Sequence, residues 1–161
     1  STADFGRPAR DDVQVLPYAG YAASFFPGLA WDVGLSHSAF LRNHDYDYPE
    51  LYWGLATDHL RARLSYARRY FGEDRQALYL ELDGSRPLAE RLHLTGHVGF
   101  LRVDGQGYAY DQTDFRVGFS LDLDQAHVAL SWVATDARDL AYALGVSRDR
   151  ATFVLSITRP F

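Results

Sequence analysis

Apolar and polar residues alternate with a period of two along much of this chain. In the stretch 48–71 the apolar positions are odd at Leu51, Trp53 and Leu55, and become even after Asp58-His59. A period of two on both sides of a two-residue break is typical of a β-hairpin, because successive side chains of a strand point to opposite faces. The pattern therefore predicts two strands joined at Asp58-His59.

The register of this hairpin follows if Thr57 faces Leu60. The predicted pairs are Leu55–Ala62, Trp53–Leu64 and Leu51–Tyr66 on one face, and Ala56–Arg61, Gly54–Arg63 and Tyr52–Ser65 on the other. Each arginine then faces a small residue, which leaves room for its guanidinium over the partner strand. A hairpin with one apolar face and one charged face belongs to a sheet that separates two environments.

The same alternation predicts nine strands in all. They are 13–23, 29–40, the two halves of 48–71, 76–83, 91–103, 113–122, 126–134 and 150–161. Residues 1–12 are predicted as a loop, and only a helical turn at 139–144 interrupts the β pattern. Many short strands with turn residues between them indicate one antiparallel barrel or sandwich over residues 1–161.

The predicted connections alternate in length. Those at 41–47, 104–112 and 135–149 fall at one end of the sheet and are long, whereas most at the other end are short. Bacterial outer-membrane barrels show this asymmetry, and they have an even number of strands. Nine strands, in a chain that contains no Met, therefore lead us to expect an odd number of further strands ahead of residue 1.

Composition narrows the classes of function. With 161 residues, no Cys and a net charge of -5, the chain is one domain without thiol chemistry and is not a general nucleic-acid binder. No apolar run approaches the roughly 20 residues of a transmembrane helix. The mean hydropathy of -0.25 does not exclude a barrel, because alternating strands average to a value near zero.

The two faces give two sets of candidate residues. The side chains predicted to line a lumen are Glu50, Arg61, Arg63, Arg69, Glu81, Asp83, His93, His97, Asp114 and Arg116, with Arg91 and Asp122 beside them. The side chains predicted to face lipid are Leu51, Trp53, Leu55, Leu64, Leu80, Phe115, Phe119, Leu130, Trp132, Phe153 and Leu155. Aromatic residues near strand ends are predicted to form interfacial girdles: Tyr46, Tyr48, Tyr70, Phe71, Tyr108 and Tyr110.

The histidines do not indicate a metal or catalytic site at this stage. His93 and His97 share a face, but four residues along a strand span roughly 13 Å, so one ion cannot bridge them without ligands from another strand. His127 and Ser131 have the same spacing problem as a catalytic pair, and His44, Asp45 and Asp47 fall in a loop. No phosphate loop or nucleophile elbow is present. We therefore predict no metal, no cofactor and no enzyme activity.

Several segments resemble the TorF-type family of porin-like proteins of proteobacterial outer membranes. They are PYAGYAASF, LAWDVGLSHSAF, YPELYWGLATDHLRARLSYARRYF, DFRVGFSLDLDQAHVALSWVATD and ATFVLSITRPF, of which Tyr48–Tyr52 is the most specific. The resemblance spans nearly all 161 residues. It implies a signal peptide and about three strands ahead of this chain, hence an up-and-down transmembrane β-barrel of twelve strands, without implying a particular solute.

The expected function is thus an outer-membrane barrel of Gram-negative bacteria, a porin or channel for small polar solutes with a mixed-charge lumen. Its expected partners are outer-membrane lipid and, through the C-terminal Phe161, the barrel-assembly machinery; the pattern gives no oligomeric state. Three alternatives stay open: a soluble β-barrel carrier of a small apolar ligand, an outer-membrane barrel that binds or supports without conducting, and a membrane-embedded hydrolase.

Overall fold

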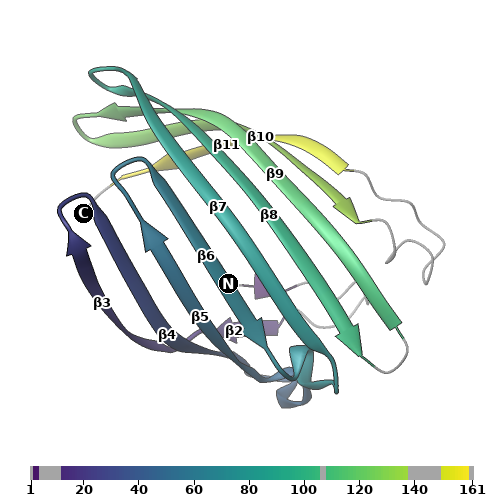
Figure 1. Ribbon diagram of the computed structural model, residues 1–161. Helices are drawn as coiled ribbons and strands as arrows, with labels where there is room; N and C mark the ends of the chain where they lie inside the picture. Colours follow the sequence, from purple (N-terminus) through teal and green to yellow (C-terminus); the bar gives the residue numbers. More distant parts are fainter. Residues whose placement is uncertain (1, 4–11, 106–107, 138–149, 160–161) are drawn as a thin grey trace.

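The computed structural model describes residues 2–3, 12–105, 108–137 and 150–159, which form one antiparallel 11-stranded sheet curled into a trough (Figure 1). The strands are β1 (Thr2–Ala3), β2 (Asp12–Val15), β3 (Tyr18–Phe26), β4 (Leu29–Phe40), β5 (Tyr48–Ala56), β6 (Leu60–Ala67), β7 (Gln76–Ala89), β8 (Leu92–Gly105), β9 (Tyr108–Leu123), β10 (Ala126–Ala137) and β11 (Arg150–Thr158). Two short 3-10 helices, η1 (His44–Tyr46) and η2 (Tyr70–Gly72), lie at one end. No helix within these described ranges is long and apolar enough to cross a membrane.

Neighbouring strands in the sheet follow the chain order, so the topology is up and down. From β4 to β11 each strand pairs with the next, while β3 and β2 both pair with β4. Within the described residues no pairing joins β11 to β1, β2 or β3, and the sheet therefore has free edges. The prediction of an all-β, antiparallel, up-and-down sheet is confirmed at this level.

The first predicted strand, 13–23, is divided into β2 and β3. The break falls at Leu16-Pro17, where proline has no N–H to give to the ladder. The carbonyl of Pro17 still accepts a hydrogen bond from the amide of His37 at 2.9 Å. β1 pairs with β2, so the prediction of a loop throughout residues 1–12 is wrong at Thr2, Ala3 and Asp12.

The hairpin β5–β6 has the predicted register at all six pairs. Its turn closes where Thr57 donates its amide to the carbonyl of Leu60 at 2.7 Å. The Thr57 hydroxyl also accepts the amide of Leu60 at 3.1 Å. A threonine that satisfies the turn amides explains why Asp58-His59 can stand in place of the more usual Asn-Gly.

Two predicted loops are strands instead. The predicted loop 84–90 is wrong, because β7 continues to Ala89 and pairs with β8, with a shift of register between Pro87 and Ala89. A bulge accommodates the missing proline N–H there. The predicted loop 104–112 is also wrong in large part, since β8 runs to Gly105 and β9 begins at Tyr108.

The correction at 84–90 shortens a turn at one end of the trough, whereas that at 104–112 leaves only residues 106 and 107 between β8 and β9 at the other end. At one end the turns are all tight, at Pro27-Gly28, 57–59, Glu90-Arg91 and Asp124-Gln125. The other end carries the connections 41–47 and 68–75 with η1 and η2. We call these the tight-turn end and the long-loop end. The predicted helical turn at 139–144 lies outside the described residues.

Candidate functional site

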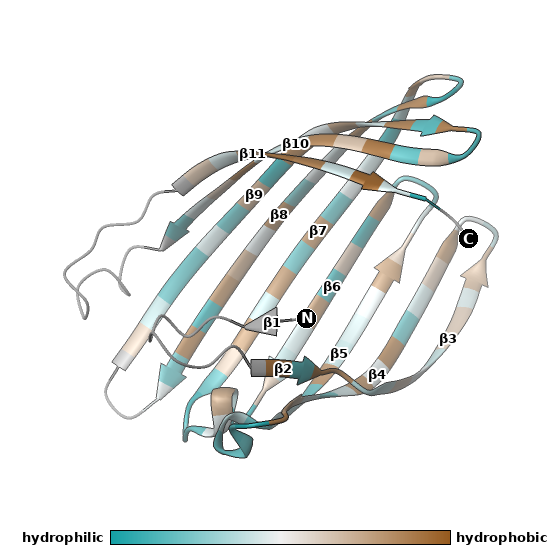
Figure 2. Ribbon diagram, turned by 180° about the vertical axis from the view of Figure 1, so that it is seen from behind, coloured by the Kyte–Doolittle hydropathy of each residue, from teal (hydrophilic) through white to brown (hydrophobic). Residues whose placement is uncertain are grey.

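Alternate residues of the strands form two unlike faces, visible as alternating hydropathy bands in Figure 2. The eleven side chains predicted to face lipid all lie on one face, here called the outer face, as the cross-strand pairs Trp53–Leu64, Leu64–Leu80 and Leu130–Leu155 illustrate. Ten of the eleven are exposed, and Leu155 is 65% exposed.

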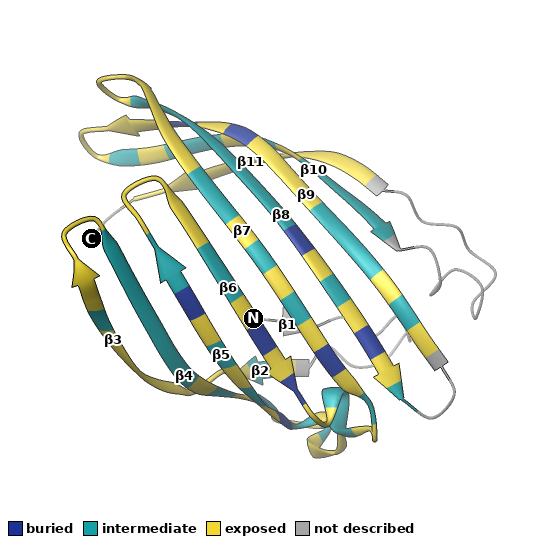
Figure 3. Ribbon diagram, viewed as in Figure 1, coloured by how far each residue is buried: buried dark blue, intermediate teal, exposed yellow. Residues whose placement is uncertain are grey.

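The other face, here called the inner face, is polar and more enclosed. Its serines Ser65 and Ser120 are only 7% and 6% exposed, and most of the buried positions in Figure 3 belong to this side of the sheet. A curved sheet crowds the side chains of its concave face, so this face is the lining of the trough. Its charged side chains are the candidate site.

One ion cluster of the inner face spans β4 to β7. Arg63 on β6 donates to Asp32 on β4 at 3.2 Å, and its Nε lies 4.0 Å from an oxygen of Glu81 on β7. The guanidinium also lies 4.5 Å from the ring centroid of Tyr52, a cation–π arrangement. Arg61 stands 4.0 Å from the same Asp32 carboxylate. The predicted room over Gly54 is what lets Arg63 reach Asp32 across β5.

A second ion cluster spans β7 to β9 and centres on His97. The ring of His97 contacts Asp83 through Nδ1 at 2.8 Å and Asp114 through Nε2 at 2.9 Å. Arg116 donates to Asp83 at 3.3 Å, and the Tyr79 hydroxyl donates to Asp114 at 3.2 Å. Each ring nitrogen of His97 is thus in contact with a carboxylate.

Glycines make both clusters possible. A side chain at Gly54 would meet the Asp32 carboxylate, and one at Gly99 would meet the Tyr79 hydroxyl and Asp114. Each long side chain thus crosses a middle strand where that strand has no Cβ, and reaches a partner two strands away. The inner face is consequently linked across strands that share no backbone hydrogen bonds.

The long-loop end of the inner face is apolar and well packed. The buried residues here are Phe40, Tyr48, Ala67, Ala77 and Val103, with Tyr70, Phe71, Leu101 and Tyr110 packed against them. The Phe40 and Phe71 rings are 5.9 Å apart, and Tyr48 and Tyr70 are 5.2 Å apart. Burial raises the pKa of Tyr70. The prediction that Tyr48, Tyr70, Phe71 and Tyr110 form a lipid-facing girdle is therefore wrong.

The loop carboxylate Asp47 fixes this aromatic end to the sheet. It accepts the backbone amide of Phe40 at 2.7 Å, and His44 Nδ1 lies 3.1 Å from its second oxygen. The hydrogen bond from Phe40 is the main reason that the pKa of Asp47 is lowered. The loop cluster His44-Asp45-Asp47 thus has a structural role, because Asp47 binds the last backbone amide of β4.

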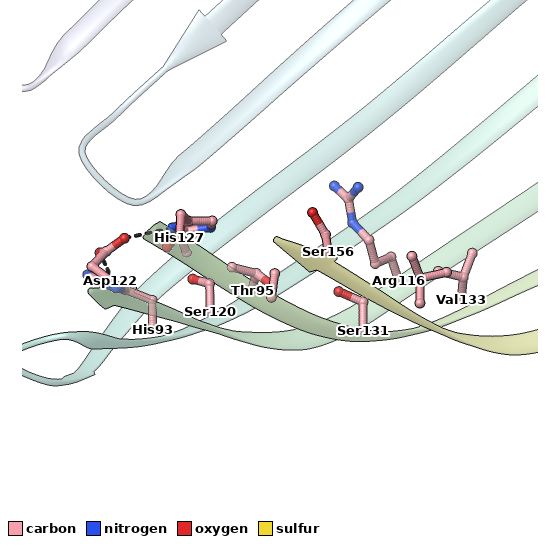
Figure 4. A pocket seen from close by; sticks show the side chains of 12 residues that line it. His93, Thr95, Arg116, Ser120, Asp122, His127, Ser131, Val133 and Ser156 are labelled. Carbon is pink, nitrogen blue, oxygen red and sulfur yellow. Dashed lines mark hydrogen bonds and ion pairs between the residues drawn. The ribbon is translucent and has the colours of Figure 1, made fainter. Parts of the chain in front are cut away.

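At the tight-turn end the inner face opens into a hollow of about 590 Å³ (Figure 4). Asp122 lies between two histidines, with His127 Nδ1 at 2.6 Å and His93 Nδ1 at 3.4 Å. The hollow is otherwise lined mainly by hydroxyl groups and small side chains, and Arg116 forms part of its wall.

Nine of the ten side chains predicted for the lumen lie on the inner face, in strands β5 to β9. Arg69 does not: β6 ends at Ala67, and Arg69 precedes η2, donating to the Gly72 carbonyl at 3.4 Å. Arg91 is in the turn before β8 and pairs with Asp124 at 2.9 Å. The alternation no longer applies where a strand has ended, which is the physical reason for both corrections.

The candidate list lacked three side chains of the ion clusters, Asp32, Tyr52 and Tyr79. The alternation itself places Asp32 and Tyr52 on the polar face, and a glycine on the adjacent strand is the signal that could have selected them. The sequence analysis also missed the link of His93 and His127 through Asp122. It considered the spacing of histidines along one strand, whereas these three residues lie on three neighbouring strands.

The comparisons with known proteins give a family without a function. No curated protein matches the chain. A family model described as "Bacterial protein of unknown function (Gcw_chp)" matches residues 6–161, which is nearly the whole chain. The chain therefore belongs to the Gcw_chp family of bacterial proteins.

Proposed function

We propose that this protein is an outer-membrane β-barrel whose outer face contacts lipid and whose inner face lines a narrow passage for small polar solutes. The observation that carries the proposal is the separation of the exposed apolar side chains of the outer face from the ion clusters of the inner face. The proposal agrees with the resemblance to TorF-type porin-like proteins, which implies the same location and a twelve-stranded barrel.

The outer face supports a lipid environment. Soluble monomers rarely expose contiguous apolar patches of more than a few hundred Å². Here large apolar side chains are exposed on β5, β7, β9, β10 and β11 alike, including Trp53, Leu80, Phe119 and Trp132. Lipid is the environment in which such a face is stable.

The inner face argues against a soluble carrier of an apolar ligand. A carrier would enclose its apolar residues and turn its charges to water. In this sheet the enclosed face carries Asp32, Arg63, Asp83 and His97, which are joined in ion clusters. Lumen-facing positions of membrane barrels are polar in this way.

The ion clusters also set the expected permeability. A twelve-stranded barrel is narrower than a 16-stranded porin, because barrel diameter grows with strand number. Arginines held against carboxylates on the wall narrow the passage further, so small solutes and a small conductance are expected. A second candidate is a barrel that binds solutes without conducting them. The aromatic side chains packed on the inner face at the long-loop end favour it, because they occupy space that a passage would need.

Fractionation tests the location. The full-length protein is expected in the outer-membrane fraction, to need detergent for extraction, and to migrate faster in SDS gels when unheated than when boiled. Recovery as a monodisperse protein without detergent would contradict the proposal and favour the carrier.

Planar-bilayer recordings test the passage. We expect a small conductance for the natural protein, and a larger and more cation-selective one when Arg61 and Arg63 are both replaced by Ser. His59→Gln, in the β5–β6 turn, is the control. An absence of conductance in both the natural protein and the double variant would favour the non-conducting barrel.

A further inference from the structure

We propose that His93, Asp122 and His127 form a binding site for a divalent transition-metal cation of the Zn²⁺ class, at the tight-turn end of the inner face. The three residues come from consecutive strands, β8, β9 and β10. This site stands on the geometry of those strands, and it does not depend on whether the barrel conducts.

The register of the strands brings the three side chains together on one face. His127 lies directly opposite Asp122, and His93 lies opposite Ser120, two residues from Asp122. Figure 4 shows both histidines joined to Asp122 by dashed contacts at the edge of the hollow. The carboxylate is thus the centre of the group, with one imidazole on each side.

The contacts with Asp122 orient both imidazoles. Both rings face Asp122 through Nδ1, at 2.6 Å for His127 and 3.4 Å for His93. The contact of His127 is a hydrogen bond, whereas that of His93 is an ion-pair distance only. Among the described residues no partner meets Nε2 of either ring. Metal-binding histidines typically have their other ring N–H held by a carboxylate in this manner.

The second histidine cluster of the inner face serves as a comparison. Donor atoms of Glu81, Asp83 and His97 lie within 4.8 Å of one another, which is more compact than the group around Asp122. However, both ring nitrogens of His97 are used by carboxylates, and Arg116 occupies Asp83. That cluster therefore offers a cation no unoccupied ring nitrogen.

The charge around Asp122 also suits a cation. The nearby Arg91 is paired with Asp124 at 2.9 Å, and Arg116 is turned to Asp83 at 3.3 Å. Neither arginine is therefore paired with Asp122. Imidazole nitrogens are ligands that Zn²⁺, Cu²⁺ and Ni²⁺ accept. The hydroxyls of Thr95, Ser120 and Ser131 line the same hollow, where they can hold waters on the ion.

Binding one ion through both rings requires a rotation of side chains. The two histidines stand on opposite sides of Asp122, and their side chains are 29% and 46% exposed. Side chains with this exposure can change rotamer without disturbing the sheet. The site is therefore expected to close around the ion by swinging the two rings toward each other.

Calorimetric titration of the full-length protein with Zn²⁺ measures the affinity. Asp122→Asn is expected to weaken Zn²⁺ binding by about 10–100-fold, the usual effect of losing the carboxylate that orients a metal-binding histidine. His93→Gln and His127→Gln are expected to weaken it at least as much. The control His59→Gln, in an exposed turn, and His97→Gln, in the other cluster, should leave it unchanged.

Electron paramagnetic resonance of bound Cu²⁺ identifies the ligands independently of affinity. The natural protein is expected to show coupling to two imidazole nitrogens, and His127→Gln to one, in samples whose heat-dependent gel migration shows that they are folded. Zn²⁺ affinity unchanged by His127→Gln, loss of binding in His97→Gln alone, or a Cu²⁺ signal without coupling to two imidazoles would each overturn the proposal.

Discussion

The outer and inner faces of the trough are made from alternate residues of the same strands, yet they are built by different rules. On the outer face many Leu, Phe, Trp and Val side chains are exposed. On the inner face Arg63 and Tyr79 make specific contacts that reach across an intervening strand, to Asp32 and Asp114 respectively. A shift of register by one residue would exchange the two sets completely. The outer face therefore needs only apolar character, whereas the inner face depends on individual residues.

The largest effect is expected where the inner face is packed like a protein core. Phe40 is 1% exposed and lies among Tyr46, Tyr48 and Phe71. Phe40→Ala should lower the free energy of unfolding by about 3–5 kcal/mol, because a buried aromatic ring is replaced by a cavity. Phe25→Ala, an exposed phenylalanine of β3, is the matched control. Equal effects in urea unfolding of the protein in lipid vesicles would contradict the packed end described here.

The second prediction compares adjacent residues of β11. Leu155→Arg on the outer face should cost about 2–4 kcal/mol if the residue lies near the middle of the bilayer. Val154→Arg, exposed on the inner face, should change stability by less than about 0.5 kcal/mol. The control must be an exposed residue of the inner face; Ser65, which is polar but buried, does not meet this condition. Urea unfolding in vesicles measures both variants, and a reversed order would exchange the faces.

The third prediction concerns the ion cluster around His97. His97→Gln removes the ring that contacts both Asp83 and Asp114, and should cost about 1.5–3 kcal/mol, the range for hydrogen bonds to charged groups. His37→Gln, whose side chain is exposed on β4, should have little effect. A negligible loss of unfolding free energy in His97→Gln would show that the cluster is a solvated surface and not a linked wall.

The smallest effect is expected in the long loops, at Asp47. Because the folded state lowers the pKa of this carboxyl, its stabilising contribution is full above the ordinary value of 3.8 and is lost as pH falls through the folded pKa. The unfolded chain binds more protons in that range, so stability rises with pH there. Asp47→Asn should flatten this part of the profile of unfolding free energy against pH. An unchanged profile would exclude a role for the bond to Phe40.

The sequence predicts the sheet well where the period-two pattern is uninterrupted. The β5–β6 hairpin has all six predicted pairs because two strands and a two-residue turn leave one register that keeps Trp53 and Leu64 on the same face. The prediction of strand ends fails where glycine and proline lie inside a strand and not in a turn. Gly84 and Pro87 lie within the strand β7, since pairing with β8 and a bulge accommodate them.

The candidate site could be predicted only as a face. Alternation places Arg63, His97 and Asp114 on one side, but the pairing of ions depends on which strands are neighbours and how they are staggered. The same is true of His93 and His127, which are linked through a residue of a third strand. Aromatic residues beyond the end of a strand, such as Tyr70 and Phe71, follow no alternating pattern. The pattern therefore could not predict that η2 packs them against the buried cluster.

The most direct test of the two faces is a spin-label scan of β11. The chain has no Cys, so single cysteines at residues 152–157 can be labelled with a nitroxide without background. In lipid vesicles, accessibility to oxygen should peak at 153, 155 and 157, and accessibility to a water-soluble nickel chelate at 152, 154 and 156. Nickel accessibility that peaks at 153, 155 and 157, or the absence of any alternation, would contradict an outer face in lipid and an inner face in water.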